Sequence, residues 1–316
     1  MLLSRKDFLK LSGAGVGTAL ALSLTPGKTI MAANRELLAQ KVETKAKAVL
    51  YDGSICIGCK SCEVACRKVN ELPAKDTTIN TNDEGPPYLS AYTFTRIVTK
   101  EAEYDGKVRP VYIKHQCMHC LHPACAEACI VGALQKMPDG AVTYDENKCI
   151  GCRYCQVACP FGIPNFEWDK PVPWIRKCDF CAERQEEGLE PMCVAACPTG
   201  AVKFGERDEL IVEARERITG ANGKYINHIY GEKEVGGTSW LYLSPVPFEE
   251  LGFAPHINEP VTINTARAMG LVPPVLVGVA AAMTGIYWLT KRRQELSQVK
   301  IDVEEDVEEK EGDEKQ

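Results

Sequence analysis

The 316-residue sequence lacks the motifs of the common catalytic and ligand-binding classes. It has no Ser/His/Asp arrangement, no phosphate-binding G-x-x-x-x-G-K-S/T loop and no G-x-G-x-x-G dinucleotide fingerprint, so no residue points to a substrate pocket. It has no C-x-x-C-H motif, which argues against covalently attached c-type haem. The net charge of −6 argues against a nucleic-acid-binding surface. The sequence therefore predicts a chain with no catalysis of its own.

What the chain does contain is sixteen cysteines in four groups of four, with none left over. The first and third groups read C-x2-C-x2-C-x3-C, the second C-x2-C-x4-C-x3-C and the fourth C-x2-C-x11-C-x3-C. The groups are Cys56, Cys59, Cys62 and Cys66; Cys117, Cys120, Cys125 and Cys129; Cys149, Cys152, Cys155 and Cys159; and Cys178, Cys181, Cys193 and Cys197. Such runs typically bind 4Fe–4S clusters, with three thiolates on one cube and the fourth on a neighbouring cube. The sequence predicts four 4Fe–4S clusters.

Two other uses of cysteine fit this pattern less well. A disulfide scaffold belongs to short chains without a core, whereas this chain is long and 45% hydrophobic. Structural zinc takes its ligands from two separated pairs, whereas here a third and a fourth cysteine follow at once. Pro160 and Pro198 directly follow Cys159 and Cys197, which matches the C-P ending of bacterial ferredoxin runs. Iron–sulfur ligation remains the favoured interpretation.

The chain contains an internal duplication. AVLYDGSICIGCKSCEVAC (48–66) and AVTYDENKCIGCRYCQVAC (141–159) are identical at 12 of 19 positions. Short strands are expected at 47–51, 141–144 and 200–204, brief helical turns at the last cysteine of the first three groups, and an amphipathic helix over 205–218. We therefore expect an α+β fold of duplicated bacterial-ferredoxin-like dicluster domains.

Linker lengths suggest how the groups share clusters. Only 19 residues separate Cys129 from Cys149, as in a compact two-cluster ferredoxin, whereas 50 separate Cys66 from Cys117. We therefore pair the second group with the third and the first with the fourth. The predicted ligand sets are Cys56, Cys59, Cys62 and Cys197; Cys66, Cys178, Cys181 and Cys193; Cys117, Cys120, Cys125 and Cys159; and Cys129, Cys149, Cys152 and Cys155.

The two ends of the chain predict export and membrane anchoring. Residues 1–33 combine a charged segment with a Gly/Ala-rich apolar stretch, similar to a twin-arginine signal in which Lys6 replaces the second arginine. Because clusters are assembled in the cytoplasm, export of the folded protein is expected, although a signal anchor is the alternative. Residues 268–290 carry no charge and precede Lys291, Arg292 and Arg293. A buried core helix is the alternative to the predicted single transmembrane helix there.

These features predict the order of segments and the location of the chain. A unit at 45–110 holds the first cysteine group and an insertion, a core at 111–204 holds the other three, and an extension at 205–265 packs against a partner. The acidic tail at 291–316 is expected to be disordered, because a run of like charge does not form a core. The basic residues that follow the span predict an inner-membrane protein with the cluster domain on the periplasmic face and a cytoplasmic C-terminus.

Charged and histidine residues near the cysteines are weaker candidates. A cluster with four thiolates carries about −2, so basic neighbours are expected to offset some of this charge. These neighbours are Lys60, Arg67, Lys68, Lys114, Arg153, Arg176, Lys177 and Arg184. Any one of them is more easily explained as a solvated surface residue. His115, His119 and His122 are expected to be ordinary loop or interface residues, because four cysteines already complete each ligand set.

The ordered cysteine groups resemble the four-cluster electron-transfer subunits of molybdopterin oxidoreductases and membrane hydrogenases. The likeness continues in five further segments: KHQCMHC, CIGCRYCQVACPFGIP, CPTGAVKFG, IYGEKEVGGTSWLYL and VPFEELGF. The chain departs from the family pattern at Ile130, which follows Cys129 in place of a proline. An export signal combined with a C-terminal anchor is most similar to the ferredoxin-like subunit of quinone-linked uptake hydrogenases. The β subunit of membrane formate dehydrogenase is the second match.

The resemblance implies two partners. Electrons would pass from a periplasmic catalytic subunit, either a nickel–iron hydrogenase or a molybdenum/tungsten bis-pterin enzyme, through the clusters to an integral membrane subunit that reduces quinone. Residues 230–243 would pack against a partner. A free-standing redox sensor or electron carrier is the alternative of a different class.

Overall fold

The computed structural model describes residues 46–73, 89–220, 223–253 and 258–313, so the predicted signal peptide at 1–33 lies outside the described residues. The chain divides into two units. One unit spans residues 39–263 and contains all sixteen cysteines, and the other includes residues 264–316. We call the first the cysteine unit.

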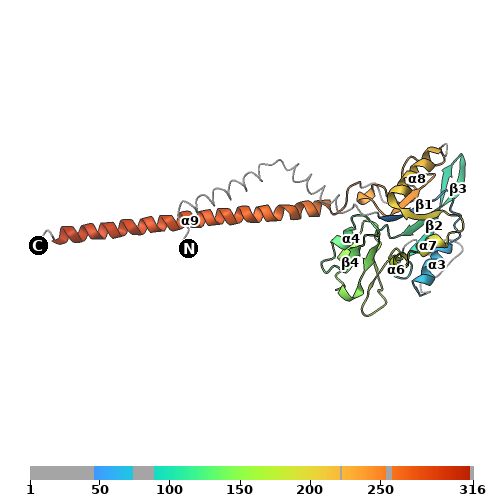
Figure 1. The fold of residues 1–316 in the computed structure, drawn as a ribbon. Helices are drawn as coiled ribbons and strands as arrows, with labels where there is room; N and C mark the ends of the chain where they lie inside the picture. Colours follow the sequence, from blue (N-terminus) through green and yellow to red (C-terminus); the bar gives the residue numbers. More distant parts are fainter. Residues whose placement is uncertain (1–45, 74–88, 221–222, 254–257, 314–316) are drawn as a thin grey trace. The chain divides into compact units, whose positions relative to one another are not determined.

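The cysteine unit mixes short strands and short helices (Figure 1), which confirms the predicted α+β class. Its strands are β1 (Lys47–Asp52), β2 (Thr95–Tyr104), β3 (Lys107–Gln116), β4 (Leu134–Lys136), β5 (Val142–Tyr144), β6 (Asn165–Phe166), β7 (Ile175–Arg176), β8 (Val202–Glu206) and β9 (Trp240–Leu243). Its helices are α3 (Ser61–Val69), α4 (Ala124–Glu127), α5 (Tyr154–Ala158), α6 (Ala182–Glu186), α7 (Met192–Ala195) and α8 (Arg207–Gly220), with 3₁₀ turns η2 (Glu146–Lys148) and η3 (Glu234–Gly236).

A three-stranded sheet in the order β8-β1-β9 joins distant parts of the sequence. Strand β1 is antiparallel to β8 and parallel to β9, with Val49 opposite both Phe204 and Trp240. The other described strands form the two-stranded pairs β2–β3, β4–β5 and β6–β7. As a result, the strand that precedes the first cysteine group lies beside the strand that follows the fourth.

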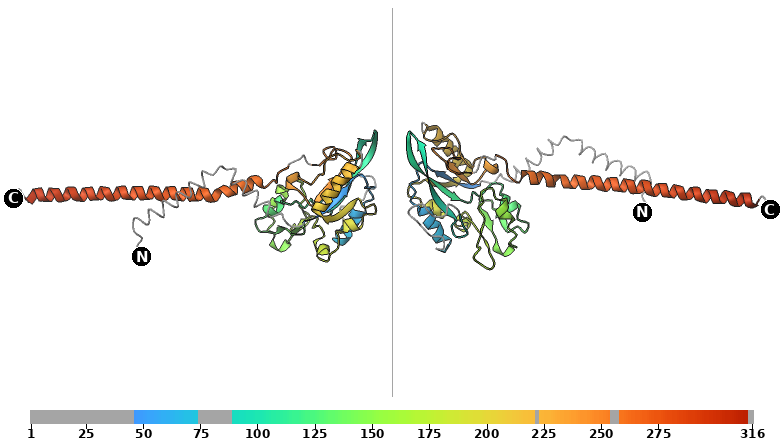
Figure 2. Two further views of the ribbon diagram at one scale, coloured as in Figure 1. Left: turned by 45° about the horizontal axis from the view of Figure 1, so that its top comes forward. Right: turned by 180° about the vertical axis from the view of Figure 1, so that it is seen from behind.

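Helix α8 covers one face of this sheet. The pleat turns Ala48 and Leu50 of β1 to the same side, where they pack with Leu210 and Ala214 of α8. Figure 2 (left) shows α8 lying along the strands. A helix predicted over 205–218 thus forms, but at 207–220, with Leu210 and Ala214 buried, while Gly205 and Glu206 belong to β8.

The opposite face of the sheet is turned toward the cysteines. Val49 and Tyr51 of β1 belong to a buried cluster that also includes Phe180, Cys62 and Cys193. The sheet therefore separates the helix α8 from the cysteine groups, and the residues of β1 alternate between the two sides.

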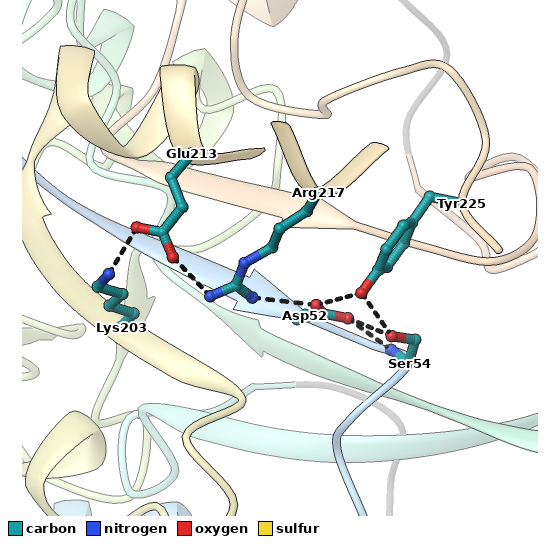
Figure 3. A network of polar contacts seen from close by, with 6 residues as sticks. All are labelled: Asp52, Ser54, Lys203, Glu213, Arg217 and Tyr225. Atoms are coloured by element: carbon teal, nitrogen blue, oxygen red, sulfur yellow. Dashed lines mark hydrogen bonds and ion pairs between the residues drawn. The ribbon is translucent and has the colours of Figure 1, made fainter. Parts of the chain in front are cut away.

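Asp52, at the end of β1, anchors the sheet to α8 (Figure 3). Its carboxylate is fully buried and accepts hydrogen bonds from Arg217 Nη1 (3.1 Å), Tyr225 OH (2.7 Å) and Ser54 N and Oγ (2.9 and 2.6 Å). Glu213 holds Arg217 from the other side at 2.6 Å. Each group that contacts the Asp52 carboxylate is thus a hydrogen-bond donor, and the carboxylate is its acceptor.

Both copies of the duplication use an aspartate in the turn before the first cysteine of the group. The carbonyl of Asp52 accepts from Cys56 N (3.3 Å), while its carboxylate accepts from Ser54 N. In the second copy the Asp145 carboxylate accepts from Asn147 N (3.0 Å). These side-chain-to-backbone bonds define the turn that delivers each cysteine run from its strand.

The two copies also share an unusual backbone conformation. Gly58 and Gly151 have φ of 67° and 70°, and the basic residues two positions later, Lys60 and Arg153, have φ of 59° and 67°. Lys60 and Arg153 directly precede helices α3 and α5. The duplication seen in the sequence therefore extends to the conformation of the cysteine loops.

The expected helical turns at the last cysteine form in only one of three places. Helix α3 contains Cys66, whereas α4 and α5 end before Cys129 and Cys159. Cys159 is extended (φ −75°, ψ 117°) because Pro160 disfavours a helical conformation in the residue before it.

Residues 230–243, which the resemblance predicts to pack against a partner, are largely buried within their own chain. Tyr230, Trp240 and Tyr242 are no more than 2% exposed, and β9 forms an edge of the central sheet. Contact between a partner and the remaining surface of this segment, such as the exposed Lys233, stays a prediction.

The unit that includes residues 264–316 contains one long helix, α9 (Ile263–Asp313). Its residues 268–298 include an 18-residue stretch with a mean hydropathy of 1.8, which is long and apolar enough to cross a membrane, and they contain the predicted span 268–290. The disorder predicted for 291–316 is wrong as far as Asp313, because α9 continues to that residue. Glu, Lys, Arg and Gln are good helix formers, so an acidic segment can extend a helix that has already started.

Substituting Asp52→Ala should lower the free energy of unfolding by about 2 kcal/mol, because four donor groups of three half-buried residues lose their acceptor. Chemical denaturation of the purified protein measures this loss. Lys203→Met is the control: Lys203 pairs with Glu213 at the exposed edge of the same network and should change stability by less than about 0.5 kcal/mol. Equal losses in the two variants would contradict the anchoring role of Asp52.

Gly58→Ala should destabilise the protein more than Gly151→Ala. Both variants place alanine in a left-handed conformation, at a cost of about 1–2 kcal/mol. At Gly58 the added Cβ would also lie 2.3 Å from the Tyr112 ring, whereas nothing lies within 4 Å at Gly151. Thermal unfolding and iron content of the two variants give the comparison, and similar losses would show that the Tyr112 contact does not matter.

Candidate metal centres

Each cysteine group starts in a loop that follows a strand. The first group follows β1, the second follows β3, the third follows β5 and the η2 turn, and the fourth follows β7. The third cysteine of each group then lies in a short helix. These four residues are Cys62 in α3, Cys125 in α4, Cys155 in α5 and Cys193 in α7. All sixteen cysteines are free thiols.

The first cavity brings together cysteines from the two ends of the cysteine unit. Cys56, Cys59 and Cys62 of the first group line it together with Cys197 of the fourth. The pairing of β1 with β8 accounts for this meeting, because the first group follows β1 and Cys197 precedes β8.

The second cavity contains the remaining cysteines of the same two groups. Cys66, at the end of α3, lines it together with Cys178, Cys181 and Cys193. The contact between α3 and α7 brings these segments together. The fourth cysteine of each group thus lies with the first three of the other.

The second and third groups also meet. Cys125 and Cys155 belong to one buried cluster, against which Cys129 and Cys149 pack. Burial raises the pKa of the Cys120 thiol, and the nearby thiols of Cys117, Cys159 and Cys125 raise it further. We call this part of the molecule the second-and-third-group region.

The Cys155 thiol has a different set of neighbours in the same region. Burial raises its pKa to about 11, and the thiols of Cys129, Cys149 and Cys152 add to the effect. Within the region, Cys120 and Cys155 are therefore surrounded by cysteines of two different sets.

Burial raises the pKa of eight of the sixteen thiols, which makes them poor acids in the metal-free chain. It raises the pKa of Cys62, Cys66 and Cys125 to about 12. A metal ligand must be a thiolate, so iron binding at neutral pH has to displace protons from these side chains. The energy to ionise them must come from the bound iron, because desolvation opposes it.

Several sulfur atoms accept hydrogen bonds from the backbone. Ala133 N donates to Cys129 Sγ (3.2 Å), Gly151 N to Cys149 Sγ (3.4 Å) and Phe180 N to Cys178 Sγ (3.4 Å). Such bonds to the sulfur atoms are among the factors that set the reduction potential of an iron–sulfur cluster.

His119, expected to be an ordinary loop residue, connects the second cysteine group to the second cavity. Its Nδ1 accepts from Val142 N (2.9 Å), so the proton lies on Nε2, 3.5 Å from Cys178 Sγ. The ring stacks on Phe180 with centroids 4.7 Å apart. Burial, followed by the charges of nearby lysines, lowers its pKa, so the imidazole is a neutral donor to the sulfur. Only the folded chain reveals this role, because His119 and Cys178 are far apart in the sequence.

The eight basic residues near the cysteines occupy different environments. Lys114 and Lys177 are buried, whereas the others are half-buried or exposed. Lys177 donates to the carbonyls of Val142 and Cys178. Arg176 is paired with Glu167 at 3.2 Å. The interpretation as solvated surface residues is therefore wrong for two of the eight.

The residues around the second cavity fit an anionic iron–sulfur cluster. The cavity offers four thiols, which are the ligand type that such clusters require. The indole Nε1 of Trp240, another lining residue, is buried without a hydrogen-bond partner. A buried donor of this kind is costly unless an acceptor is supplied, and cluster sulfur is one such acceptor. Cys66, Cys178, Cys181 and Cys193 are the residues that would hold the cluster.

Comparison with known proteins agrees with this chemistry. Residues 108–207 match the family described as the 4Fe-4S dicluster domain. A protein of Nitratidesulfovibrio vulgaris is 44% identical over 79% of this chain and 68% of its own length. The hydrogenase-2 operon protein HybA of Escherichia coli O157:H7 is 36% identical over 79% of this chain and 83% of its own.

A second group of relatives is about equally similar. The iron–sulfur subunit of the nitrate-inducible formate dehydrogenase of Escherichia coli K12 is 34% identical over 76% of this chain and 82% of its own length. Identity at this level over most of both chains establishes common descent, and the chain belongs to the family of iron–sulfur electron-transfer subunits that includes HybA and the formate dehydrogenase iron–sulfur subunits.

Proposed function

We propose that the chain carries four 4Fe–4S clusters and relays electrons between a periplasmic hydrogenase catalytic subunit and an integral membrane subunit that reduces quinone. The observation that carries this proposal is that two cavities are each lined by four cysteines, three from one group and one from another. When bound, a 4Fe–4S cluster accepts and releases one electron at a potential that its surroundings set.

The arrangement of the cysteines supports the ligand pairing expected from the linker lengths. The first cavity contains Cys56, Cys59, Cys62 and Cys197, and the second contains Cys66, Cys178, Cys181 and Cys193. For the other two clusters we propose Cys117, Cys120, Cys125 and Cys159, and Cys129, Cys149, Cys152 and Cys155. The thiols that act on Cys120 and on Cys155 support this division.

Two exposed cysteines suggest where electrons enter and leave. Cys59 and Cys152 are exposed, and they belong to different proposed cluster pairs. Exposed apolar side chains lie two positions from each in the sequence: Ile57 (58% exposed) before Cys59 and Tyr154 (60%) after Cys152. Apolar surface of this kind is typical of contacts with other proteins. Two such surfaces, one near Cys59 and one near Cys152, agree with a relay between two partners. We propose that the chain itself supplies no catalytic group.

The helix α9 supports a membrane-bound location. Residues 268–298 have the length and composition of a membrane span, and Lys291, Arg292 and Arg293 favour the cytoplasmic side. We therefore propose an inner-membrane protein with a single span, a periplasmic cysteine unit and a cytoplasmic C-terminus.

A formate dehydrogenase or a related molybdopterin enzyme is the alternative catalytic partner. The relative that is a formate dehydrogenase subunit is 34% identical, against 36% for HybA, so sequence identity favours the hydrogenase only slightly. In either complex the chain performs the same electron transfer.

The ligand pairing predicts which cysteine variants share a spectroscopic change. Cys197→Ser and Cys56→Ser should alter the same cluster signal in electron paramagnetic resonance (EPR) spectra of the complex, because both side chains line the first cavity. Cys193→Ser should alter a different signal, although Cys193 and Cys197 are in the same group. A common signal for Cys193→Ser and Cys197→Ser, with another for Cys56→Ser, would disprove the proposed pairing.

Metal analysis of the complex that purifies with the chain distinguishes the two partners. Nickel is expected for a hydrogenase, whereas molybdenum or tungsten identifies the alternative. The chain should co-purify with the corresponding activity, and its removal should abolish quinone reduction while leaving activity with an artificial acceptor. A chain that purifies alone, with neither activity, would contradict both forms of the proposal.

A further inference from the structure

A buried lysine, Lys114, lies beside the second cavity. Its side chain extends from β3 and is 1% exposed. Nζ donates to Thr95 Oγ1 (2.5 Å) on β2 and to Gln116 Oε1 (3.0 Å). It also lies 4.5 Å from the centroid of the Trp240 ring. Each of these partners is electrically neutral.

Lys114 forms no ion pair with a carboxylate within the described ranges. The carboxylate of Glu63, which is close enough to interact with its charge, accepts a hydrogen bond from Ile97 N instead. A buried ammonium with only neutral partners is strongly unfavourable. The fold therefore places a positive charge where the side chains around it do not neutralise it.

Cysteine thiols are the acidic groups that act most strongly on this charge, and the carboxylate residue Asp179 also lines the second cavity. Lys114 lines the second cavity together with Cys66, Cys178 and Cys193. It also lies beside the first cavity, because Ile97, which is opposite Lys114 in the β2–β3 pair and on the same face, lines that cavity together with Cys62. One ammonium group thus lies beside cysteines of both cavities.

Neighbouring residues hold Lys114 in place. The Gln116 side chain accepts from Lys114 Nζ and donates to the hydroxyl of Tyr242. That hydroxyl in turn donates to the backbone carbonyl of Lys114 (3.0 Å). Gln116 and Tyr242 are each 2% exposed. Since the surrounding side chains are fixed by these bonds, the charge has a defined position relative to both cavities.

We propose that Lys114 is a positioning residue that serves as the shared internal counter-ion of the two clusters held by the first and second cavities, and that its charge raises the reduction potentials of both. A cluster becomes more negative when it accepts an electron, so a fixed positive charge in a low-dielectric interior favours the reduced form. This inference rests on the proposed function, because it requires those two clusters.

The test is an EPR-monitored redox titration of the whole complex carrying Lys114→Met, which removes the charge and keeps a side chain of similar length. At a fixed potential, the ratio of reduced to oxidised cluster should fall about tenfold for two of the four signals, equal to about 59 mV for a one-electron couple. The other two signals should stay unchanged. Lys114→Arg should retain the wild-type potentials, and Lys203→Met, which removes an exposed lysine, should change none.

Iron content is measured for every variant. If Lys114→Met does not load iron, the same tenfold fall in the ratio of reduced to oxidised cluster is expected for Lys114→Gln. Loading of Lys114→Arg but of neither neutral variant would also support a counter-ion. Wild-type potentials in a fully loaded neutral variant, or loss of loading in the Arg variant as well, would overturn this inference while the proposed function stands. Wild-type complex without 4Fe–4S signals would instead overturn the proposed function.

Discussion

The structure depends on the pairing of β1 with β8. A cluster that needs four thiolates can take three from one cysteine run, but the fourth must come from elsewhere in the chain. The antiparallel pairing of β1 and β8 brings Cys197 to the first cavity, and the contact between α3 and α7 brings Cys66 to the second. Helix α8 and the Asp52 network support the opposite face of the same sheet. The fold thus serves first to join two distant cysteine groups.

Burial around the cysteines creates an electrostatic problem that the chain meets with positive and hydrogen-bond-donating groups. Desolvation opposes the ionisation of Cys62 and Cys66, yet both would have to be thiolates to bind iron as proposed. Lys114, with no carboxylate partner in the described part of the chain, and the indole of Trp240, whose Nε1 is unsatisfied, lie at the second cavity. Donors that are costly in the metal-free chain become favourable beside an anionic cluster, so folding and cluster insertion are expected to stabilise each other.

Much of the secondary structure was accessible from local patterns. The strands at β1, β5 and β8 and the amphipathic helix α8 lie within two residues of their predicted bounds, because alternation and helical spacing report which face is buried. The charge pattern misjudged one segment: the acidic residues 291–313, predicted to be disordered, extend α9.

The sequence by itself determined the number and grouping of the cysteines. Their spacing alone predicts iron–sulfur chemistry, because only a few spacings let three thiolates of one run bind the same 4Fe–4S cluster. The tertiary structure decided the roles of the residues around them. Lys114 and His119 look like two of many basic residues in the sequence, and only folding places one as a buried charge at the second cavity and the other against Cys178 Sγ. Burial and long-range contact determine these roles, and neither is a property of a local sequence pattern.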